Sequence, residues 1–393
     1  MAGGGGPRIL LAVTADQSLK LMRGFPRYLV EAGWDVNIVS GGDSKVSASV
    51  YVGECSSVTF HRVPMVRDPS PLRDILGLIY WIRLLHEVRP DMVSVGTPKA
   101  SLLGLLAAKL LGVPVRVHIL RGLRCETATG YWRMVLVWFE RLTAWTATQT
   151  IAVSPSLRTL ALQLGIGDSQ RIAVLGSGSS NGVEVREVAD FEGRPPDHRS
   201  RRKAELGLDP NLPTVGFVGR LTPDKGLGDL ASALISLREL GVETQLVLVG
   251  EEDLAGYVDT LLEPLSRHGI TVHQTGYVAD PSRFFAAMDI FCLPSLREGL
   301  PNVSLEAAVH YLPVITTDAT GCIDSVIHEV TGLIYPKGDV KALARSLRVL
   351  ATDDAKRNDM GEAGARWVSN TFNRVGVWTL HEKFYRELVS HVQ

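Results

Sequence analysis

The order in which helix-like and strand-like segments alternate constrains the fold of this 393-residue chain more than any other feature. An apolar segment with helical spacing is followed by a Gly or Pro stop and then by a short run rich in β-branched residues. This order recurs in LLGLLAAKLLGVPVRVHIL, LASALISLRELGVETQLVLVG and LEAAVHYLPVITTD. Repeated units of this kind imply right-handed crossovers between parallel strands, so the sequence predicts an α/β protein whose parallel sheets carry helices on both faces.

The length is typical of two domains, and a break in composition indicates where the first one ends. Residues 183–203 are VEVREVADFEGRPPDHRSRRK, a charged segment with Pro-Pro and little apolar periodicity, which predicts a linker and connecting loop. We therefore predict one doubly wound domain over 1–185, a second over 186–370, and a helix within 371–393 that can cross back to the first. Such domains bind ligands at the carboxyl ends of their strands, which predicts a cleft where the two domains face each other.

Composition excludes several classes of function. The formal net charge of −1 provides no general attraction for nucleic acid, and four scattered cysteines without a CxxC motif favour reduced thiols over a zinc ribbon. The N-terminus, MAGGGGPRILLAVTADQS, is typical of a lead into a first strand and not of a signal peptide. The scattered cysteines fit reduced thiols in a cytosol, so we expect a cytoplasmic protein. No apolar run approaches the ~18 residues that span a bilayer.

Two glutamates frame the start of a predicted helix in residues 294–321, PSLREGLPNVSLEAAVHYLPVITTDATG. Glu298 precedes the helix and Glu306 lies in its first turns, so both can point towards the helix N-terminus, which is a natural site for anions. Carboxylates beside an anion are favourable only if hydroxyl groups donate to them. A sugar nucleotide supplies both phosphates and hydroxyls; the alternative is an ordinary surface loop.

A second loop, GRLTPDKGLGDL, follows the predicted strand at 214–218 and contributes positive charge. Arg220 and Lys225 can clamp a diphosphate there, although either can instead pair with Asp224 at the surface. The segment TGYV ends another predicted strand. Tyr277 and Val278 can offer backbone groups to the edge of a base, unless the segment is a simple turn.

The candidate acceptor residues lie in the first domain. Thr97 and Lys99 follow a predicted strand, and they either contact a charged ligand or form a capped helix start with a solvated lysine. His118, Arg121 and Glu126 lie in RVHILRGLRCETATG, with His118 near the end of a strand. A lone histidine is more often structural than catalytic, so the position of His118 at a strand end leaves both roles open.

Residues 131–145, YWRMVLVWFERLTAW, are apolar around most of a helix. A helix of this kind is more often buried in the protein. Because residues 113–141 contain five Arg against two Glu, the alternative is an interfacial helix that seats the protein on an anionic membrane surface.

Some motifs are missing from the sequence: there is no Walker A, no GxSxG and no D-x-D triplet. The lack of D-x-D argues against a divalent metal on a bound diphosphate and favours protein cations in that role. We therefore predict no metal and no other cofactor.

Together these motifs resemble the family-4 glycosyltransferases, which have the GT-B fold of two Rossmann-like domains facing across a cleft. The resemblance is carried by GRLTPDKG at 219–226, TGYV at 275–278, AAMDIFCLPSLREGLPNVSLEAAVHYLPVITTD at 286–318 and TGLIYPKGD at 331–339. The segments VGTPKASLLGLLAAKLLGVPVRVH, RGLRCETATG, VSPSLR and GSGSSNGVEV resemble a subgroup that acts in bacterial surface-polysaccharide assembly.

The resemblance implies a donor site in the second domain. Its residues would be Arg220, Lys225, Tyr277, Val278, Glu298, Asn302, Val303, Ser304 and Glu306. In that site Glu298 would meet the donor sugar and Glu306 the ribose, while Arg220 and Lys225 would stabilise the departing diphosphate. The amides of 302–304 would reach phosphate or sugar, and 277–278 would hold the base through their backbone.

The catalytic residues implied in the same way are Glu298, Arg220, Lys225 and His118, with His118 beside the transferred sugar. The acceptor-side candidates are Ser18, Thr97, Lys99, Arg121 and Glu126. Many relatives have a Gly-rich loop after the first strand, whereas this chain has TADQSLKLMRG, in which Ser18 is the candidate substitute.

The implied function is retaining transfer of a sugar from a nucleotide-diphosphate donor, UDP-linked, to a glycan or polyprenyl-diphosphate acceptor without a metal. It would take place in the cytoplasm, either in solution or in peripheral contact with the inner face of the membrane. The alternatives are tailoring of a soluble natural product, a GT-B-fold sugar-nucleotide 2-epimerase, and a non-enzymatic partner subunit. The epimerase would need acid and base carboxylates in the first domain, where Glu126 is the one candidate.

Overall fold

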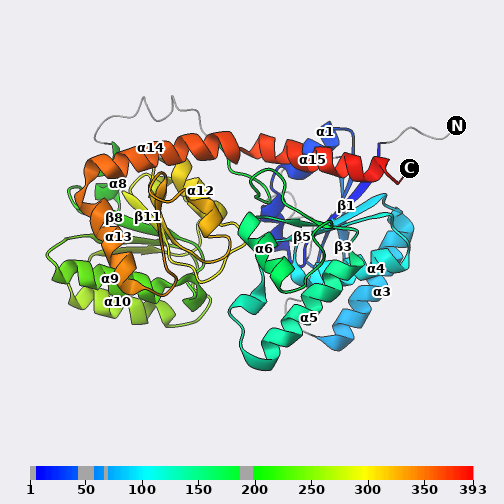
Figure 1. Cartoon of the computed structure of the whole chain (residues 1–393), viewed down its shortest axis with the longest axis horizontal. Helices are drawn as coiled ribbons and strands as arrows, with labels where there is room; N and C mark the ends of the chain where they lie inside the picture. The colour runs from blue at the N-terminus through cyan, green and yellow to red at the C-terminus, as the bar shows by residue number, and fades with distance from the viewer. Residues whose placement is uncertain (1–5, 43–56, 66–69, 186–197, 393) are drawn as a thin grey trace. The chain divides into compact units, whose positions relative to one another are not determined.

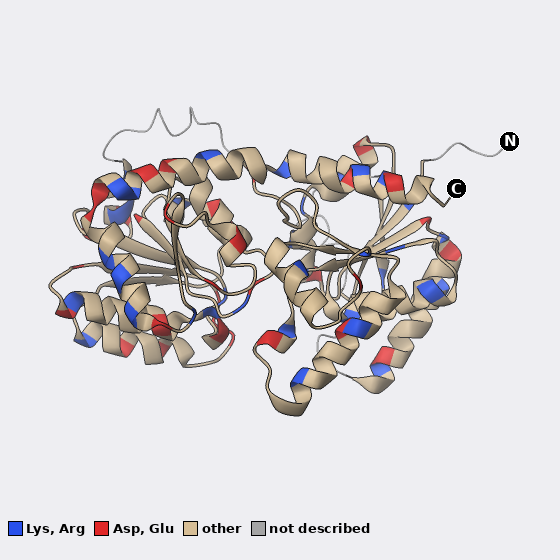
Figure 2. Cartoon of the chain, in the orientation of Figure 1, with Lys and Arg blue, Asp and Glu red and all other residues tan. Residues whose placement is uncertain are grey.

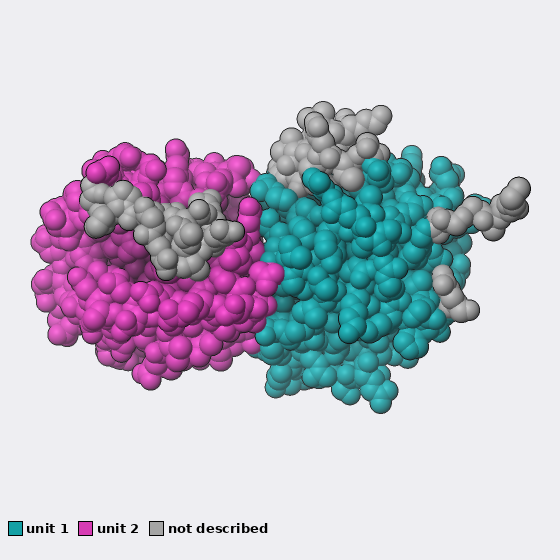
Figure 3. Space-filling view, turned by 90° about the horizontal axis from the view of Figure 1, so that it is seen from above, with its two compact units in different colours: residues 1–182, 374–393 teal, residues 183–373 magenta. Residues whose placement is uncertain are grey.

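The computed structural model describes residues 6–42, 57–65, 70–185 and 198–392. The chain divides into two compact units, shown in different colours in Figure 3. Unit 1 contains Met1–Gly182 together with Arg374–Gln393, and unit 2 contains Val183–Asn373. Each unit is built on one parallel sheet, so the predicted α/β class with two parallel-sheet domains is confirmed.

The sheet of unit 1 has seven parallel strands in the order β3-β2-β1-β4-β5-β6-β7. They are β1 (Arg8–Ala12), β2 (Asp35–Ser40), β3 (Val58–Arg62), β4 (Met92–Val95), β5 (Val115–Leu120), β6 (Gln149–Ala152) and β7 (Ile172–Ala173). The strand order reverses between β1 and β4, which pair directly, with Leu10 opposite Val93. A reversal of this kind leaves a crevice at the carboxyl ends of the two strands, where ligands bind in doubly wound sheets.

The helices of unit 1 are α1 (Phe25–Glu31), α3 (Pro71–Val88), α4 (Pro98–Leu110), α5 (Gly130–Thr146), α6 (Pro155–Gln163) and α15 (Arg374–Ser390), with 3₁₀ turns η1 (Asp16–Met22) and η2 (Arg124–Glu126). In Figure 1, α1 and α15 lie on the opposite side of the sheet from α3 and α4. The C-terminal helix α15 is fixed by polar contacts. Trp378 donates to Asn181 at 2.8 Å, and the Tyr385 hydroxyl lies 3.0 Å from that of Ser94.

The segment between β1 and β2 is not one continuous helix. Gly24 adopts φ +81° and separates η1 from α1. A side chain on Gly24 would overlap the ring of Trp378 on α15, so the break gives α15 room to pack.

Unit 2 contains a six-stranded parallel sheet in the order β10-β9-β8-β11-β12-β13. Its strands are β8 (Thr214–Val218), β9 (Gln245–Val249), β10 (Val272–Thr275), β11 (Ile290–Leu293), β12 (Val314–Thr317) and β13 (Gly332–Tyr335). Its helices are α8 (His198–Glu205), α9 (Leu227–Glu239), α10 (Tyr257–Arg267), α11 (Ser282–Phe285), α12 (Asn302–Val309), α13 (Val340–Thr352) and α14 (Asp354–Thr371), with 3₁₀ turns η3 (Pro223–Lys225) and η4 (Ile323–Ser325). Strands β9, β11 and β12 are buried along their whole length, as expected for a parallel sheet covered on both faces. The order reverses between β8 and β11.

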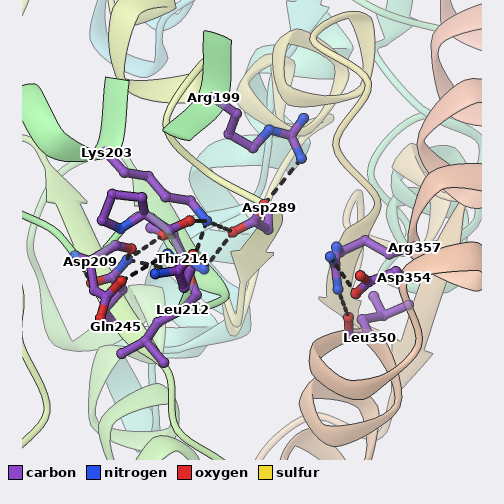
Figure 4. Close-up of polar contacts among 12 residues, drawn as sticks. Arg199, Lys203, Asp209, Leu212, Thr214, Gln245, Asp289, Leu350, Asp354 and Arg357 are labelled. Carbon is purple, nitrogen blue, oxygen red and sulfur yellow. Dashed lines mark hydrogen bonds and ion pairs between the residues drawn. The ribbon is translucent and has the colours of Figure 1, made fainter. Parts of the chain in front are cut away.

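A buried polar network lies at the amino ends of β8 and β11 (Figure 4). Asp289 accepts from the backbone amide of Thr214 at 2.7 Å and pairs with Lys203 at 2.7 Å and Arg199 at 3.2 Å. Lys203 and Asp289 are both almost fully buried. The network attaches α8 to the sheet and leaves the carboxyl ends of the strands to the site described below.

The linker predicted over 183–203 is corrected at its C-terminal end, because α8 begins at His198 and places Lys203 in the core. Residues 186–197 lie outside the described residues.

The expectation that residues 131–145 form a buried helix is also wrong. They form most of α5, but Tyr131, Trp132 and Trp138 are 74%, 68% and 58% exposed. Between residues 130 and 142, all of which the structure describes, Val137 is the one buried residue.

Candidate active site

The loops that follow β8 and β11 interlock at the carboxyl edge of the unit 2 sheet, where the strand order reverses. Gly226 adopts φ +69°, and a side chain there would overlap the carbonyl oxygen of Pro294, so this close approach requires glycine. The amide of Leu296 donates to the carbonyl of Asp224 at 3.0 Å. These backbone contacts hold the two loops against each other.

This arrangement brings together two of the predicted catalytic residues, which are separated by 73 positions. The Lys225 Nζ lies 2.5 Å from the Glu298 Oε1, and both side chains are less than a fifth exposed. The hydroxyl of Ser295 donates to the same carboxylate oxygen at 2.9 Å. The backbone of Glu298 is fixed in turn, because its amide donates to the Thr320 carbonyl at 2.9 Å. We call Lys225, Glu298 and Ser295 the β8–β11 cluster.

A second ion pair, between Arg297 and Asp224, joins the same two loops. Arg297 donates to Asp224 Oδ2 at 3.1 Å, and Thr222 donates to Asp224 Oδ1 at 2.5 Å. Burial opposes ionisation of Asp224. The hydrogen bond from Thr222 and the charges of Lys225, Arg297 and Arg220 outweigh that effect and hold the pKa of Asp224 below its ordinary value. The loop therefore carries a permanent negative charge that helps to orient its cations.

Arg220, the other predicted cation, lies at the end of β8 but makes a different contact. Its guanidinium lies 2.5 Å from Asp253 Oδ2 in the loop after β9, and its side chain is 58% exposed. An exposed pair of this kind contributes only about 0–1 kcal/mol to stability. Arg220 can therefore exchange Asp253 for an anionic ligand at little cost.

The start of α12 provides the predicted amides. Asn302 and Val303 lie in the first turn, where helix geometry leaves backbone N–H groups without an intrahelical acceptor. The amide of Ser304, in contrast, donates to the carbonyl of Pro301 at 3.0 Å. The Ser304 hydroxyl is buried and has no hydrogen-bond partner among the described residues. Glu306 lies one turn further along, half-buried.

The residues proposed to hold a base, Tyr277 and Val278, follow β10 at the same edge of the sheet. Val278 packs against the core of unit 2, whereas Tyr277 is 57% exposed. In the sheet, β9 lies between their strand and β8.

Three residues that contact Glu298, Asp224 and Arg220 were not expected from the sequence: Ser295, Arg297 and Asp253. Each of them follows the carboxyl end of a strand, and this position is the one sequence feature that could have indicated them. Ser295 lies two residues beyond β11, and Asp253 lies in the loop after β9.

In unit 1 the strand order reverses between β1 and β4, and there Thr97, after β4, contacts Thr14, after β1. Thr97 Oγ1 accepts from the amide of Thr14 at 2.8 Å and lies 2.9 Å from its hydroxyl. Lys99 pairs with Asp74 of α3 at 2.8 Å and is only 13% exposed. Both residues therefore have structural contacts within unit 1.

His118 lies in β5, and Arg121 directly follows Leu120, the last residue of that strand. His118 is 4% exposed, and burial lowers its pKa to about 4, so the ring is neutral at physiological pH. The Nε of Arg121 is buried without a hydrogen-bond partner among the described residues, and Gly96 leaves room for this guanidinium. Arg121, Ser94, His381 and Tyr385 line a cavity of about 30 Å³, enough for a single water.

The remaining acceptor candidates lie in the two 3₁₀ turns of unit 1. Ser18 is half-buried in η1, where its amide donates to the Ala15 carbonyl at 2.9 Å. Glu126 is half-buried in η2. Arg121 donates to the Leu21 carbonyl of η1 at 3.4 Å, which links this turn to β5.

The chemistry of the unit 2 site follows from these contacts. Two cations, a helix N-terminus and a carboxylate gather at one switch point, which suits a ligand with negative phosphates and neutral hydroxyl groups. Within the described residues, no group of three or more His, Cys, Asp or Glu side chains is placed to hold a metal ion.

Comparison with protein-family models gives two matches. Residues 22–178 match the glycosyl transferase 4-like domain, and residues 212–353 match glycosyl transferases group 1.

Among curated proteins, the capsular polysaccharide biosynthesis glycosyltransferase CapM of Staphylococcus aureus is 33% identical over 96% of this chain and 96% of its own length. The UDP-Gal:alpha-D-GlcNAc-diphosphoundecaprenol alpha-1,3-galactosyltransferase of Escherichia coli is 28% identical over 79% of each chain.

Solved structures share the fold across almost the whole chain. Anabaena HepE in complex with UDP superimposes with a TM-score of 0.76 at 20% identity, covering 98% of this chain and 100% of that one. The sucrose-phosphate synthase of Thermosynechococcus elongatus gives a TM-score of 0.80 at 18% identity, with the same coverage.

Proposed function

Since the chain belongs to the family-4 glycosyltransferases and has their GT-B fold, we propose that it transfers a sugar, with retention and without a metal, from a UDP-sugar to a lipid-linked glycan. The predicted family, fold and enzyme class are confirmed by these comparisons. The donor, the stereochemistry and the acceptor are the proposal.

The observation that carries the proposal is the contact between Lys225 and Glu298 at the reversal of β8 and β11. In this contact the carboxylate of Glu298 neutralises the charge of Lys225. When a diphosphate arrives, it competes for Lys225, because phosphate oxygens are strong acceptors for an ammonium group. Glu298 is then released to accept hydrogen bonds from sugar hydroxyls, while Ser295 continues to orient it.

The reaction needs a leaving group that is stabilised rather than a protein nucleophile. The bond from the anomeric carbon to the diphosphate breaks, and a bond from the same carbon to the acceptor oxygen forms on the same face. The acceptor's proton passes to the departing phosphate. Lys225 and Arg220 stabilise the charge that develops on the diphosphate, which makes electrostatic stabilisation and positioning the main sources of catalysis.

Metal independence follows from the same side chains in this proposal. Lys225 and Arg220 provide two positive charges at the diphosphate, the number that one divalent ion would supply. Activity should therefore survive complete chelation with EDTA. Loss of activity that Mg²⁺ or Mn²⁺ restores would overturn this part of the proposal.

The acceptor is proposed from the relatives. One is named for capsular polysaccharide biosynthesis, and another for a diphosphoundecaprenol-linked substrate. A lipid-linked acceptor implies work at a membrane, so we place the protein in the cytoplasm with peripheral contact at the inner face. No described helix is both long enough and apolar enough to span a bilayer.

The test is turnover with a panel of donors. UDP-sugars, GDP-sugars and free nucleotides are first ranked by thermal shift, because a bound donor stabilises the fold by mass action. The best donor is then incubated with a short-chain polyprenyl-diphosphate sugar, and the product is analysed by mass spectrometry and by the anomeric coupling in NMR. An α-linked product from an α-linked donor supports the proposal. Transfer only to a soluble acceptor, an inverted linkage, or epimerisation of the donor alone would overturn it.

A further inference from the structure

The exposed apolar residues of the described chain are concentrated on one layer of unit 1. Thirteen of the twenty-three large apolar side chains that are exposed lie between Leu72 and Trp145, on α3, the end of α4, and α5. All three exposed tryptophans are on α5, at positions 132, 138 and 145. Soluble proteins rarely leave such a large apolar area uncovered, so this layer requires an explanation.

Helix α3 has two apolar faces. Its inner face packs on α4 through buried residues that include Trp81, Leu84 and Leu85. Its outer face carries an exposed stripe at helical spacing, formed by Leu72, Ile75, Leu76, Ile79 and Tyr80. Leu72 is 79% exposed and Ile75 is 58% exposed, so no part of unit 1 that the structure describes covers the start of this stripe.

Helix α5 carries a second stripe and packs against the same α4. Its exposed residues are Tyr131, Trp132, Met134, Trp138, Phe139 and Trp145. Lys109 of α4 lies over the Trp145 ring, 3.0 Å from its centroid, which joins the ends of the two helices. Figure 1 shows α3, α4 and α5 together as one layer on this side of the sheet. We call the outer residues of α3 and α5 the α3–α5 face.

The charge on this face is positive. Arg73 and Arg83 are exposed on α3, and Arg133 and Arg141 are exposed on α5. Figure 2 shows these helices with isolated charged residues separated by long uncharged stretches.

The acidic residues on these helices do little to cancel that charge. Asp74 is already paired with Lys99. Burial raises the pKa of Glu140 to about 7, so this carboxyl group is only partly ionised at neutral pH. Glu87, near the C-terminus of α3, remains as an exposed acid.

From this geometry we propose that the α3–α5 face docks on an anionic lipid bilayer. Trp and Tyr prefer the interface between lipid head groups and acyl chains, and arginines beside them are attracted to anionic lipids. Helices with an apolar outer face lie flat in that interface without spanning it. The proposal rests on the proposed function only for the lipid nature of the acceptor, and binding is measured without donor or acceptor.

The experiment measures flotation of the full chain with vesicles of phosphatidylglycerol and, separately, of phosphatidylcholine. We expect binding to phosphatidylglycerol that weakens as salt rises, and much weaker binding to phosphatidylcholine. The three exposed tryptophans act as internal probes, since their fluorescence should be quenched by lipids brominated near the head group. Equal binding to both vesicle types, or no quenching, would overturn the proposal.

Two double variants separate the electrostatic contribution to membrane binding from the hydrophobic one. Arg83→Gln with Arg133→Gln should lower partition into anionic vesicles about 30-fold, the equivalent of ~1 kcal/mol for each arginine near a charged surface. Trp132→Ala with Trp138→Ala should lower partition by about tenfold or more, because large apolar side chains leave the lipid. The matched control is Leu240→Ala, an equally exposed leucine in unit 2, which should bind like the wild type.

A second copy of the chain is the competing occupant of the face. Light scattering in the absence of lipid decides this point. A monomer that binds vesicles supports the membrane proposal, whereas a stable dimer that the Trp132→Ala and Trp138→Ala changes dissociate would replace it.

Discussion

Replacing Lys225 by alanine should reduce kcat/KM for sugar transfer by roughly 10- to 150-fold. The lysine is expected to make one charge-assisted hydrogen bond to the donor diphosphate, which contributes ~1.5–3 kcal/mol. Each 1.36 kcal/mol corresponds to a factor of about ten in rate. The structure places the result towards the upper end, because removal of Lys225 also leaves the mostly buried Glu298 carboxylate unpaired beside the incoming phosphates.

The assay is release of UDP under limiting donor, with thermal unfolding measured on the same preparations. The matched control is Lys341→Ala, which removes an exposed lysine from α13 and should stay within about twofold of the wild type. A Lys225→Ala variant that folds normally and turns over at the wild-type rate would refute the assignment of the diphosphate to this residue.

A double-mutant cycle tests the coupling itself. If Lys225 and Glu298 form one unit, the combined Lys225→Ala and Glu298→Gln variant should lose less activity than the product of the two single losses. Purely multiplicative losses would show that the 2.5 Å contact between Lys225 and Glu298 has no part in the reaction cycle.

Three further outcomes follow from the structure. Glu298→Gln keeps the shape of the side chain but removes its charge, so the KM for the donor sugar should rise while the variant still folds. A wild-type KM would contradict the contact of Glu298 with the sugar. Asp289→Ala leaves the buried charge of Lys203 unpaired and should lower the free energy of unfolding in urea by about 3–5 kcal/mol. The control Glu263→Ala, at an exposed ion pair, should lower it by under ~1 kcal/mol, and equal losses would contradict the buried network. Burial lowers the pKa of His118 and His381 to about 4, below an unfolded value near 6.5. The free energy of unfolding should therefore fall as pH drops from 6.5 towards 4, by up to ~1.4 kcal/mol per pH unit for each ring. His381→Phe should remove one such contribution, and an unchanged slope of unfolding free energy against pH would show that this ring is protonated in the native state.

The fold was predictable because its signal is repeated along the chain. Each helix–strand unit carries its own apolar pattern, and the burial of β9, β11 and β12 along their length matches the continuous apolar runs that indicated parallel strands. The break at Gly24 was not predictable from that signal. It depends on Trp378, more than 350 positions away, which occupies the space next to the glycine.

The exposure of α5 was not predictable either. Periodicity shows which residues are apolar, but it cannot show which of them another element covers. In α5 the residues that meet the protein are small or few, such as Ala144 and Val137, while the tryptophans face outward. The exposed stripe of α3 could not be predicted from the sequence, because this stripe and the buried face of the helix are equally apolar.

The pairing of Lys225 with Glu298 resolves a difficulty that the sequence posed. Carboxylates beside an anion site are unfavourable, and no residue close to Glu298 in sequence offsets its charge except Arg297, which pairs with Asp224 instead. The compensating charge comes from the neighbouring strand's loop, and it reaches Glu298 only because β8 and β11 are adjacent where the strand order reverses. In the same contact the charges of Lys225 and Glu298 neutralise each other. A diphosphate that displaces Glu298 from Lys225 gains a cation and simultaneously frees an acceptor for hydroxyl groups, so phosphate and sugar are recognised by one exchange of partners.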